Sequence, residues 1–470
     1  MAKTKTVSEK LKLTHLLGYG CGDGGGMLTL YLVSGYLTRY VTNVLKVDPA
    51  ILATMLLIWN IWDAVNDPMM GTLMDMSFAK AKNKNNKFRP WILRSIPIMT
   101  VGLIALYSVP SRLTGFAQLA ALFALKIVYE AGYTMMNIGM GSLLGVMSTN
   151  NEERTQLSSA RGFGSTIGGL VAGMMIPQIL KRFGQTAEGF MIAGIVCAIA
   201  GGIVIFLHYA LTEERNVQAQ NKVAEKKSEA DKVKFTDILN VFKVNRAYLA
   251  LCVHSICIVC GTTVASQAGT FMYSDVLGDI GMMSMASAMS SGVNIAILSI
   301  TPFLAKKFEL VKIIRTALLT GIVLFVGMFG LSMVTSISPF IYVIVVGLAT
   351  GMLTLSTRMQ WGLVGESIDY NEYLTGKRTE GSIYGTFSLT RRIGSTIASS
   401  LGVLIIGWIG YDANAAEAGL AQAASTIFGI KCMHMLAPAI GALGSWIAFT
   451  FIWNITKDTR DKMAAWKAAK

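Results

Sequence analysis

Long apolar segments separated by short polar ones dominate this chain. Each apolar segment has about 20 residues or more, the length that a helix needs to cross ~30 Å of hydrocarbon. The pattern predicts twelve transmembrane helices, near residues 15–40, 49–75, 91–110, 117–146, 161–181, 189–211, 246–273, 283–305, 313–334, 338–364, 382–410 and 424–454. The predicted fold class is therefore an all-α membrane protein.

One longer polar run divides the pattern into two halves. Residues 213–245 are rich in both Lys and Glu, which is typical of a solvated linker. Six predicted helices precede the linker and six follow it, giving an N-terminal bundle at 1–212 and a C-terminal bundle with a short tail at 246–470. This is the layout of major facilitator transporters, whose halves rock about a site near the bilayer midplane.

Composition and charge support a membrane protein. The chain is 53% hydrophobic and only 14% charged. Its net charge of +14 is concentrated in particular loops, so we expect no nucleic-acid partner. Loops 274–282 and 411–423 carry no Lys or Arg, and the positive-inside rule therefore places both termini and the linker in the cytoplasm. We expect a multi-pass protein of the cell membrane, embedded in the lipid bilayer and functional as a monomer.

Two carboxylates lie near the middle of the second predicted helix. Asp63 and Asp67 are four residues apart, with Asn66 between them, and share one helical face. A carboxylate at the bilayer centre costs ~2.5–3.5 kcal/mol, so it is tolerated where it binds something or faces water. Carboxylate and amide oxygens suit Na⁺, Li⁺ or a proton, and we predict Asp63 and Asp67 as ligands of such a cation. The alternative is a charge pair with Arg or Lys of another helix.

Polar residues at helical spacing also line the fourth predicted helix. Lys126 and Glu130 can pair one turn apart, whereas Thr134 and Asn137 are expected to meet a solute or an ion. Polar faces on several helices indicate a shared cavity. Buried arginines can also form interhelical salt bridges, and single aromatics can be packing residues or interface anchors. The other candidates are Tyr19, Asp23, Tyr133, Arg161, Arg358, Trp361, Tyr384, Ser388, Arg391 and Arg392.

Several motifs point to packing rather than chemistry. Gly20, Gly22 and Gly25 match a dinucleotide-binding pattern, but no strand precedes them, so we expect close helix packing. Cys257 and Cys260 form a CxxC near His254, and the lack of further ligands favours packing there too. The chain has no zinc-protease motif, nucleophile elbow or phosphate-binding loop. We expect neither an enzyme nor a cofactor other than a coupling ion.

Five segments together carry a resemblance to a known family. They are YGCGD from Tyr19, WDAVNDPMMG from Trp62, KFRPWIL from Lys87, ERTQLSSAR from Glu153 and DYNEYLTGKRTEG from Asp369. Over nearly its whole length the chain resembles the glycoside, pentoside and hexuronide cation symporters, which include melibiose permease and bacterial glucuronide carriers. The resemblance implies cation-coupled sugar symport by alternating access.

The resemblance also implies roles for individual residues. It places the cation at Asp63, Asn66, Asp67 and Thr134, and favours Na⁺ over H⁺ or Li⁺. Arg161 matches the family's sugar-site arginine, and Arg392 aligns with a lysine that links the cation and sugar sites. The expected substrate-binding residues are Tyr19, Asp23, Glu130, Tyr133, Asn137, Arg161, Trp361, Ser388 and Arg392.

Departures from the family pattern concern the cargo. The acids that hold the galactosyl group in melibiose permease align with Met27 and Asn137, which argues against an α-galactoside. Without these two acids, and with Arg161 and Arg392 kept, the cavity is more positive than in melibiose permease. This favours an anionic sugar such as a hexuronide or glucuronide. Glu130 returns a negative charge, so a neutral pentoside or disaccharide stays open. H⁺ coupling and passive facilitation are the alternatives to Na⁺ symport.

Overall fold

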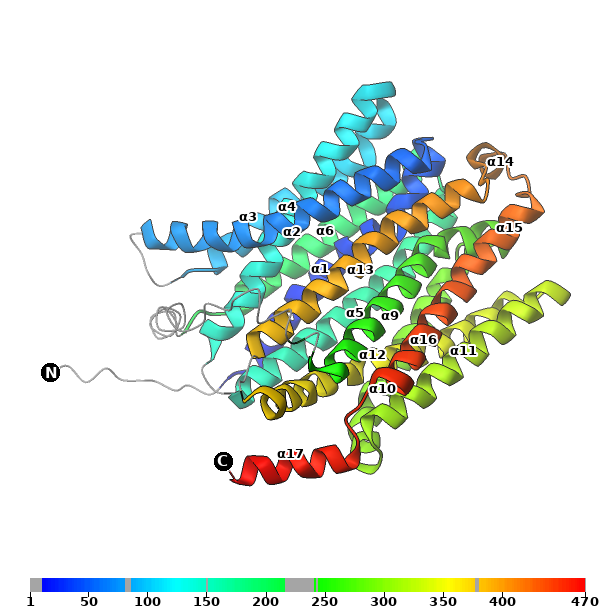
Figure 1. Ribbon diagram of the computed structural model, residues 1–470. Helices are drawn as coiled ribbons and strands as arrows, with labels where there is room; N and C mark the ends of the chain where they lie inside the picture. The colour runs from blue at the N-terminus through cyan, green and yellow to red at the C-terminus, as the bar shows by residue number, and fades with distance from the viewer. Residues whose placement is uncertain are drawn as a thin grey trace. The chain divides into compact units, whose positions relative to one another are not determined.

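The structure is a computed structural model that describes residues 11–80, 86–148, 151–215, 241, 244–376 and 380–469. Most of the predicted linker at 213–245 lies outside these residues, as does the side chain of Tyr384. The regular elements of the described residues are all helical (Figure 1). The long ones are α1 (Leu13–Arg39), α2 (Pro49–Lys80), α3 (Arg89–Ser108), α4 (Gly115–Met147), α5 (Asn151–Phe183), α6 (Ala187–Leu211), α9 (Arg246–Phe271), α10 (Met282–Lys307), α11 (Leu310–Val334), α12 (Pro339–Thr375) and α13 (Glu380–Trp408).

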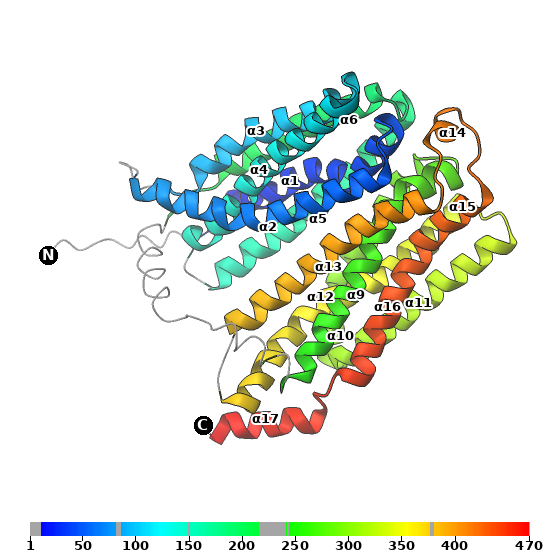
Figure 2. The same ribbon diagram turned by 45° about the horizontal axis from the view of Figure 1, so that its top comes forward.

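The last apolar segment forms one continuous span from several helical pieces. It runs through α15 (Ala424–Lys431), a π-helical turn η4 (Cys432–Leu436), α16 (Ala437–Ile447) and a second π-helical turn η5 (Ala448–Ile452). The short α14 (Ala413–Glu417) precedes it, and α17 (Lys457–Ala469) ends the described chain (Figure 2). Each apolar segment predicted from the sequence thus corresponds to a helix.

Eleven helices in the described part of the chain are long and apolar enough to cross a membrane. The predicted first span, α1, forms its helix but does not meet the same hydropathy criterion. Its many glycines and Asp23 lower its mean hydropathy. The eleven spans establish a polytopic helical fold, and a total of twelve stays a prediction.

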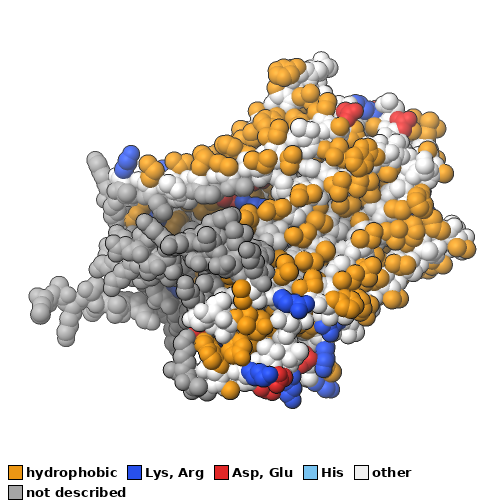
Figure 3. All heavy atoms as spheres, in the orientation of Figure 1, with side chains coloured by type: hydrophobic (Ala, Val, Ile, Leu, Met, Phe, Trp, Pro, Cys, Tyr) orange, Lys and Arg blue, Asp and Glu red, His pale blue; other side chains and the backbone are white. Residues whose placement is uncertain are grey.

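Large hydrophobic side chains cover much of the outer surface visible in Figure 3. Phe116 is 85% exposed, and Val323, Ile440 and Phe451 are each 68% exposed. A water-soluble domain rarely exposes contiguous apolar patches of large area, whereas lipid tails solvate such side chains without cost. The surface therefore suits a lipid environment.

The chain divides into two compact units. The first comprises residues 1–34 and 61–230, and in it α3 packs against α4 and α6, while α5 packs against α4 and α6. The second comprises residues 35–60 and 231–470, and in it α9 packs against α13 and α16, while α12 packs against α10 and α11. The predicted division at the linker is close to this one, except that the end of α1 and the start of α2 belong to the second unit.

Local sequence explains several helix ends. The Asn245 side chain accepts a hydrogen bond from the Tyr248 backbone N–H at 3.0 Å and caps the start of α9. Pro339 occupies the first turn of α12, where its missing N–H leaves no hydrogen bond unmade. Gly376 ends α12 with φ of 70°, a left-handed conformation that favours glycine.

Candidate functional site

Oxygen ligands from α2 and α4 meet in the first unit. The Thr134 hydroxyl donates a hydrogen bond to Asp67 Oδ1 over 3.4 Å, although the two residues are far apart in sequence. Thr134 is 4% exposed, and Asp63 and Asp67 are half-buried. Periodic polar positions on α4 and the acidic pair on α2 are therefore joined by a direct contact. The fourth predicted cation ligand, Asn66, also lies on α2, so all four come from α2 and α4.

Asn66 adds an unusual feature to this cluster. It is 4% exposed, and its Nδ2 atom makes no hydrogen bond to any described residue. A buried polar group without a partner costs about 1–3 kcal/mol. Rotation of the amide group by half a turn would place its oxygen where the nitrogen lies. Together with the carboxylates, that oxygen makes a donor set suited to a hard monovalent cation.

Asp23, Arg161 and Asn137 form a second cluster, from α1, α5 and α4. Arg161 Nε lies 2.5 Å from Asp23 Oδ2, and Arg161 Nη2 donates to Asn137 Oδ1 at 3.3 Å. The Arg161 and Asp23 side chains are 35% and 20% exposed. The structure thus brings three predicted substrate residues together. It also neutralises Arg161, so this arginine adds no net positive charge to the site.

Tyr133 of α4 is near both clusters, close enough to interact with the charges of Asp23, Glu130, Arg161 and Asp67. A phenol ring near these charged groups can offer both an apolar face and a hydroxyl to a sugar. Tyr133 is half-buried, so part of its surface stays accessible.

Tyr19 and Glu130 are predicted substrate residues that have partners within the protein. Tyr19 is fully buried and donates its hydroxyl to the Met140 carbonyl at 2.9 Å, which ties α1 to α4. Glu130 is 8% exposed and forms an ion pair with Lys126, which is 6% exposed. The two side chains neutralise each other's charge within α4, as their spacing of four residues predicts.

Trp361, Ser388 and Arg392 belong to the second unit. Trp361 of α12 is 40% exposed and stands edge-on to the buried Phe387, with 5.4 Å between ring centroids. Arg391 of α13 places its guanidinium carbon 5.5 Å from the Trp361 ring centroid, a cation–π contact. Ser388 and Arg392 are exposed and lie one turn apart on α13.

Arg391 was not among the predicted substrate residues, yet its surroundings set it apart. Its Nε atom is buried and has no hydrogen-bond partner among the described residues. No described Asp or Glu forms an ion pair with it, in contrast to Arg161. In the sequence, Arg391 is marked only by its position next to Arg392. Helix periodicity alone cannot tell which of the two arginines faces Trp361.

The glycine-rich part of α1 packs closely, as predicted. A Cβ added at Gly164 of α5 would overlap the carbonyl oxygen of Gly20, and one at Gly168 would overlap that of Gly24. Small residues four apart on both helices let the two backbones approach each other. At the CxxC, the Cys260 thiol donates to the Gly394 carbonyl at 3.4 Å. Within the described residues no group of three His, Cys, Asp or Glu is arranged to hold a metal.

Comparisons with known proteins show the family of this chain. A family model described as MFS/sugar transport protein matches residues 18–457. The glucuronide carrier protein homolog of Escherichia coli is 25% identical over 454 residues, which cover 95% of this chain and 93% of that protein. The isoprimeverose transporter of Lactiplantibacillus pentosus is 25% identical over 439 residues, covering 92% and 87%.

A solved structure shares the fold. The crystal structure of the nucleoside transporter NupG superposes with a TM-score of 0.61 at 14% identity. The match covers 94% of this chain and 100% of that one. At this identity the likeness concerns the major facilitator fold alone.

Proposed function

This chain belongs to the MFS/sugar transport protein family, and from that premise we propose that it couples sugar transport to a monovalent cation, with Na⁺ favoured. Membership makes it a multi-pass transporter of the cell membrane that carries sugars, and not an enzyme. The proposal concerns what drives transport, which residues bind the ion and which kind of sugar is carried.

The contact between Thr134 and Asp67 carries the proposal. It joins α2 and α4 at the point where Asn66 is buried without a partner for its amide nitrogen. We assign Asp63, Asn66, Asp67 and Thr134 as the cation ligands. A bound Na⁺ compensates the two carboxylate charges in part, and a turned Asn66 amide would add its oxygen as a further ligand, which lowers the cost of burying this polar set.

A proton is the second candidate for the coupling ion. Protonation would neutralise one carboxylate directly, but it would not need the oxygens of Asn66 and Thr134. Four oxygen-bearing side chains on two helices in direct contact therefore favour Na⁺ or Li⁺ over H⁺.

For the cargo we propose an anionic sugar of the hexuronide or glucuronide class. Arg161 is paired with Asp23, so the predicted positive charge must come from elsewhere. Arg391, whose guanidinium lies over the exposed Trp361 ring, supplies it. Indole faces stack on sugar rings, and a guanidinium binds a carboxylate with two parallel hydrogen bonds. A neutral pentoside or disaccharide is the alternative, and it would use Trp361 without Arg391.

We further propose twelve transmembrane helices, with α1 as the first and with both termini in the cytoplasm. Transport follows by alternating access, with reciprocal coupling: the cation raises the affinity for the sugar, and the sugar raises the affinity for the cation by the same factor.

A thermal-shift panel tests the proposal. The purified protein is melted with a series of glucuronides, hexuronates and neutral glycosides, each with NaCl or with an equal concentration of choline chloride. Ligands that bind only the folded state raise its stability, so the true sugar should raise the Tm more in Na⁺ than in choline. Asp67→Asn and Thr134→Val should lose the Na⁺ effect, whereas Thr134→Ser keeps the hydroxyl and should retain it.

Vesicle uptake of the identified sugar distinguishes the alternatives. An inward Na⁺ gradient should drive accumulation above the external concentration, and collapsing that gradient should abolish it. Accumulation that follows a pH gradient alone would replace Na⁺ by H⁺. Equilibration without accumulation would make the protein a facilitator. If Asp67→Asn keeps full Na⁺-stimulated uptake, the assignment of the ion site is wrong.

A further inference from the structure

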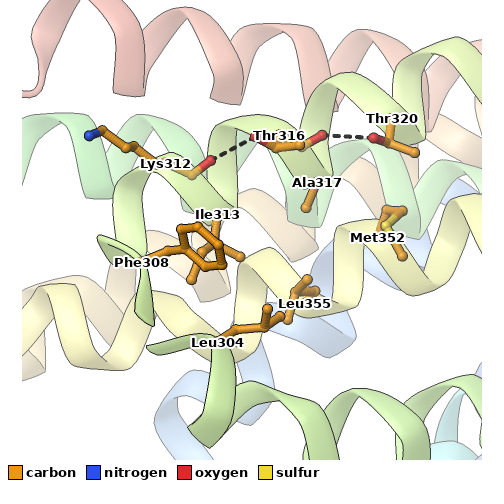
Figure 4. Close-up of a pocket in the computed structure, with 9 residues that line it drawn as sticks. All are labelled: Leu304, Phe308, Lys312, Ile313, Thr316, Ala317, Thr320, Met352 and Leu355. Carbon is orange, nitrogen blue, oxygen red and sulfur yellow. Dashed lines mark hydrogen bonds between the residues drawn. The ribbon is translucent and has the colours of Figure 1, made fainter. Parts of the chain in front are cut away.

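An apolar cavity of about 340 Å³ lies within the second unit, between the end of α10, the first half of α11 and the middle of α12 (Figure 4). Leu304 and Phe308 come from the end of α10, Ala317 from α11 and Met352 from α12. The volume lies at the small end of the range of ligand pockets. None of these residues belongs to the proposed ion or sugar sites.

The polar groups of this cavity wall are already satisfied. The Thr316 hydroxyl donates to the Lys312 carbonyl at 3.0 Å, and the Thr320 hydroxyl donates to the Thr316 carbonyl at 3.0 Å (Figure 4). These threonines therefore offer their methyl groups to an occupant and require no polar ligand. The chemistry of the wall suits a hydrocarbon chain rather than a sugar or a peptide.

The position of the cavity on α11 fits a chain that enters from a membrane surface. Lys312 lies in the first turn of this span, and Thr320 lies eight positions further on, about 12 Å along the helix axis. Phe308, at the mouth, is 50% exposed. The cavity thus extends from the helix end, where lipid head groups lie, towards the lipid tails.

Charges at the mouth favour an anionic head group. The Lys312 side chain is 72% exposed, and Lys307 holds its ammonium 5.6 Å from the Phe308 ring centroid. Glu309 lies between these lysines, 3.3 Å from Lys312 Nζ, but it also pairs with Arg460 Nη1 at 3.1 Å. Arg460 pairs with both Glu309 and Glu366. Among the described side chains, Lys307, Lys312 and Arg460 therefore outnumber these two acids, and Arg315 adds a further positive charge near Glu309. This surplus is what a phosphate group would neutralise.

We propose that this cavity is a binding site for an anionic phospholipid, with one acyl chain between α10, α11 and α12 and the phosphate at Lys307 and Lys312. The predicted topology supports the assignment, because it places the α10–α11 connection on the cytoplasmic side, where basic pockets between transmembrane helices bind anionic head groups. The site is independent of the proposed transport mechanism.

Native mass spectrometry of the purified protein tests the proposal with two lipids of equal chains, phosphatidylglycerol and phosphatidylcholine. The wild-type protein should retain one phosphatidylglycerol in preference to phosphatidylcholine. Lys312→Gln should lower the phosphatidylglycerol affinity about fivefold, the equivalent of ~1 kcal/mol for one lysine near the membrane surface, and should leave phosphatidylcholine unchanged. Lys462→Gln on α17 is the matched control, because this exposed lysine pairs only with Asp458 one turn away and should change neither affinity.

Two substitutions separate the chain site from the head-group site. Thr316→Trp fills the mouth from an exposed position, and Ala317→Phe fills the interior from a buried one. Either should remove the retained lipid whatever its head group. Equal binding of both lipids by the wild-type protein, or unchanged retention by folded Thr316→Trp, would overturn the proposal.

Discussion

Arg161 and Arg391 show how differently one residue type is used in the two units. Arg161 Nε is paired with Asp23 at 2.5 Å, and Arg161 Nη2 donates to both Asp23 and Asn137. Arg391 lies over Trp361 and has a buried Nε atom without a hydrogen-bond partner in the described structure. A charged group in a membrane span is costly without a counter-charge, and no described Asp or Glu pairs with Arg391, which supports our proposal that this arginine binds the cargo.

Replacing Arg391 should therefore lower the uptake of anionic sugars. Arg391→Gln should weaken uptake of a glucuronide at least about tenfold, since a charged hydrogen bond contributes ~1.5–3 kcal/mol. Arg391→Lys should restore only part of it, because lysine lacks the planar donor pair. Uptake of labelled sugars in vesicles measures both effects.

The matched control for this series is Arg246→Gln. Arg246 starts α9, and within the described residues its side chain donates a long hydrogen bond, of 3.4 Å, to the Phe451 carbonyl. Arg246→Gln should leave uptake unchanged. Equal losses of neutral and anionic sugars in Arg391→Gln would show that this arginine supports the fold rather than the cargo.

At the scale of elements, the α1–α5 contact is set by glycines. Gly20 and Gly24 of α1 face Gly164 and Gly168 of α5 so closely that a methyl group would meet the opposite backbone. Backbone carbonyls cannot move aside as a flexible side chain can. The packing of the two helices that carry Asp23 and Arg161 therefore depends on these positions.

Gly164→Ala should destabilise the protein, because its methyl group overlaps the Gly20 carbonyl. Overpacking typically costs about 1–3 kcal/mol. Gly162→Ala, two positions away on the same helix with no neighbouring atom within 4 Å, should be neutral or slightly stabilising. Thermal melts of both purified variants measure the difference, and equal melting temperatures would contradict the proposed packing.

The terminal helix α17 is held to the second unit by ion pairs. Arg460 bridges Glu309 and Glu366, and Lys467 Nζ lies 3.0 Å from Asp369 Oδ1. The hydrogen bond from Lys312, together with the charges of Lys312 and Arg460, lowers the pKa of Glu309. A carboxyl group whose pKa is lower in the folded state stabilises it above the pKa of the unfolded chain, and this contribution is lost as the pH falls through the folded-state value.

Docking of α17 should accordingly weaken below about pH 4, near the ordinary pKa of a glutamate side chain. The effect should be small, since the Glu309 side chain is 37% exposed and solvent screens the pair. Hydrogen exchange of α17, corrected for intrinsic pH dependence, measures it. Glu309→Gln should remove part of the pH dependence and Asp458→Asn should not, because Asp458 and Lys462 form an exposed pair within α17.

For the whole molecule, α1 and α9 reveal an internal repeat. Both helices end in π-helical turns, η1 (Tyr40–Val44) and η3 (Met272–Val276). The turns close with matching backbone hydrogen bonds, from Leu45 N to Tyr40 O and from Leu277 N to Met272 O. This correspondence links the first helices of the two predicted halves.

Tyr411 connects the two repeated turns. Asn43 Nδ2 donates to the Tyr411 hydroxyl, which donates to Asp275 Oδ2, each over 2.8 Å. Burial raises the pKa of Tyr411, so its hydroxyl stays protonated and can donate. Asn43 and Asp275 occupy matching positions of the repeat, and the repeat therefore builds this junction from equivalent residues.

Topology is the prediction that concerns the entire chain. Ala418, between α14 and α15, and Ala464, on α17, are both exposed. Each can therefore be replaced by a cysteine that a maleimide can reach. If the termini are cytoplasmic, a membrane-impermeant maleimide should label Ala418→Cys in intact cells and Ala464→Cys only after permeabilisation. The unsubstituted protein gives the background of its six natural cysteines. The reverse pattern would invert the predicted orientation.

Much of the fold could be predicted because hydrocarbon thickness imposes a length on each helix. Apolar length alone located every long helix and predicted the membrane environment. The paired acids at Asp63 and Asp67 likewise stood out, since their cost in a membrane span is local and does not depend on neighbouring helices. Close packing at the α1 glycines could also be predicted, because glycine has no side chain to keep a neighbouring helix away.

Which polar groups meet follows from the packing of the helices. Helical periodicity gives a face but not the facing helix, so it could not show that Arg161 is neutralised by Asp23 or that Thr134 contacts Asp67. It also could not distinguish Arg391 from Arg392, because one residue of rotation about α13 decides which of them lies over Trp361. A membrane transporter with acids in its spans can be predicted from the amino-acid sequence, because burial of charge is costly wherever it occurs. The partners of those charges depend on interhelical distances, which only the packed helices define.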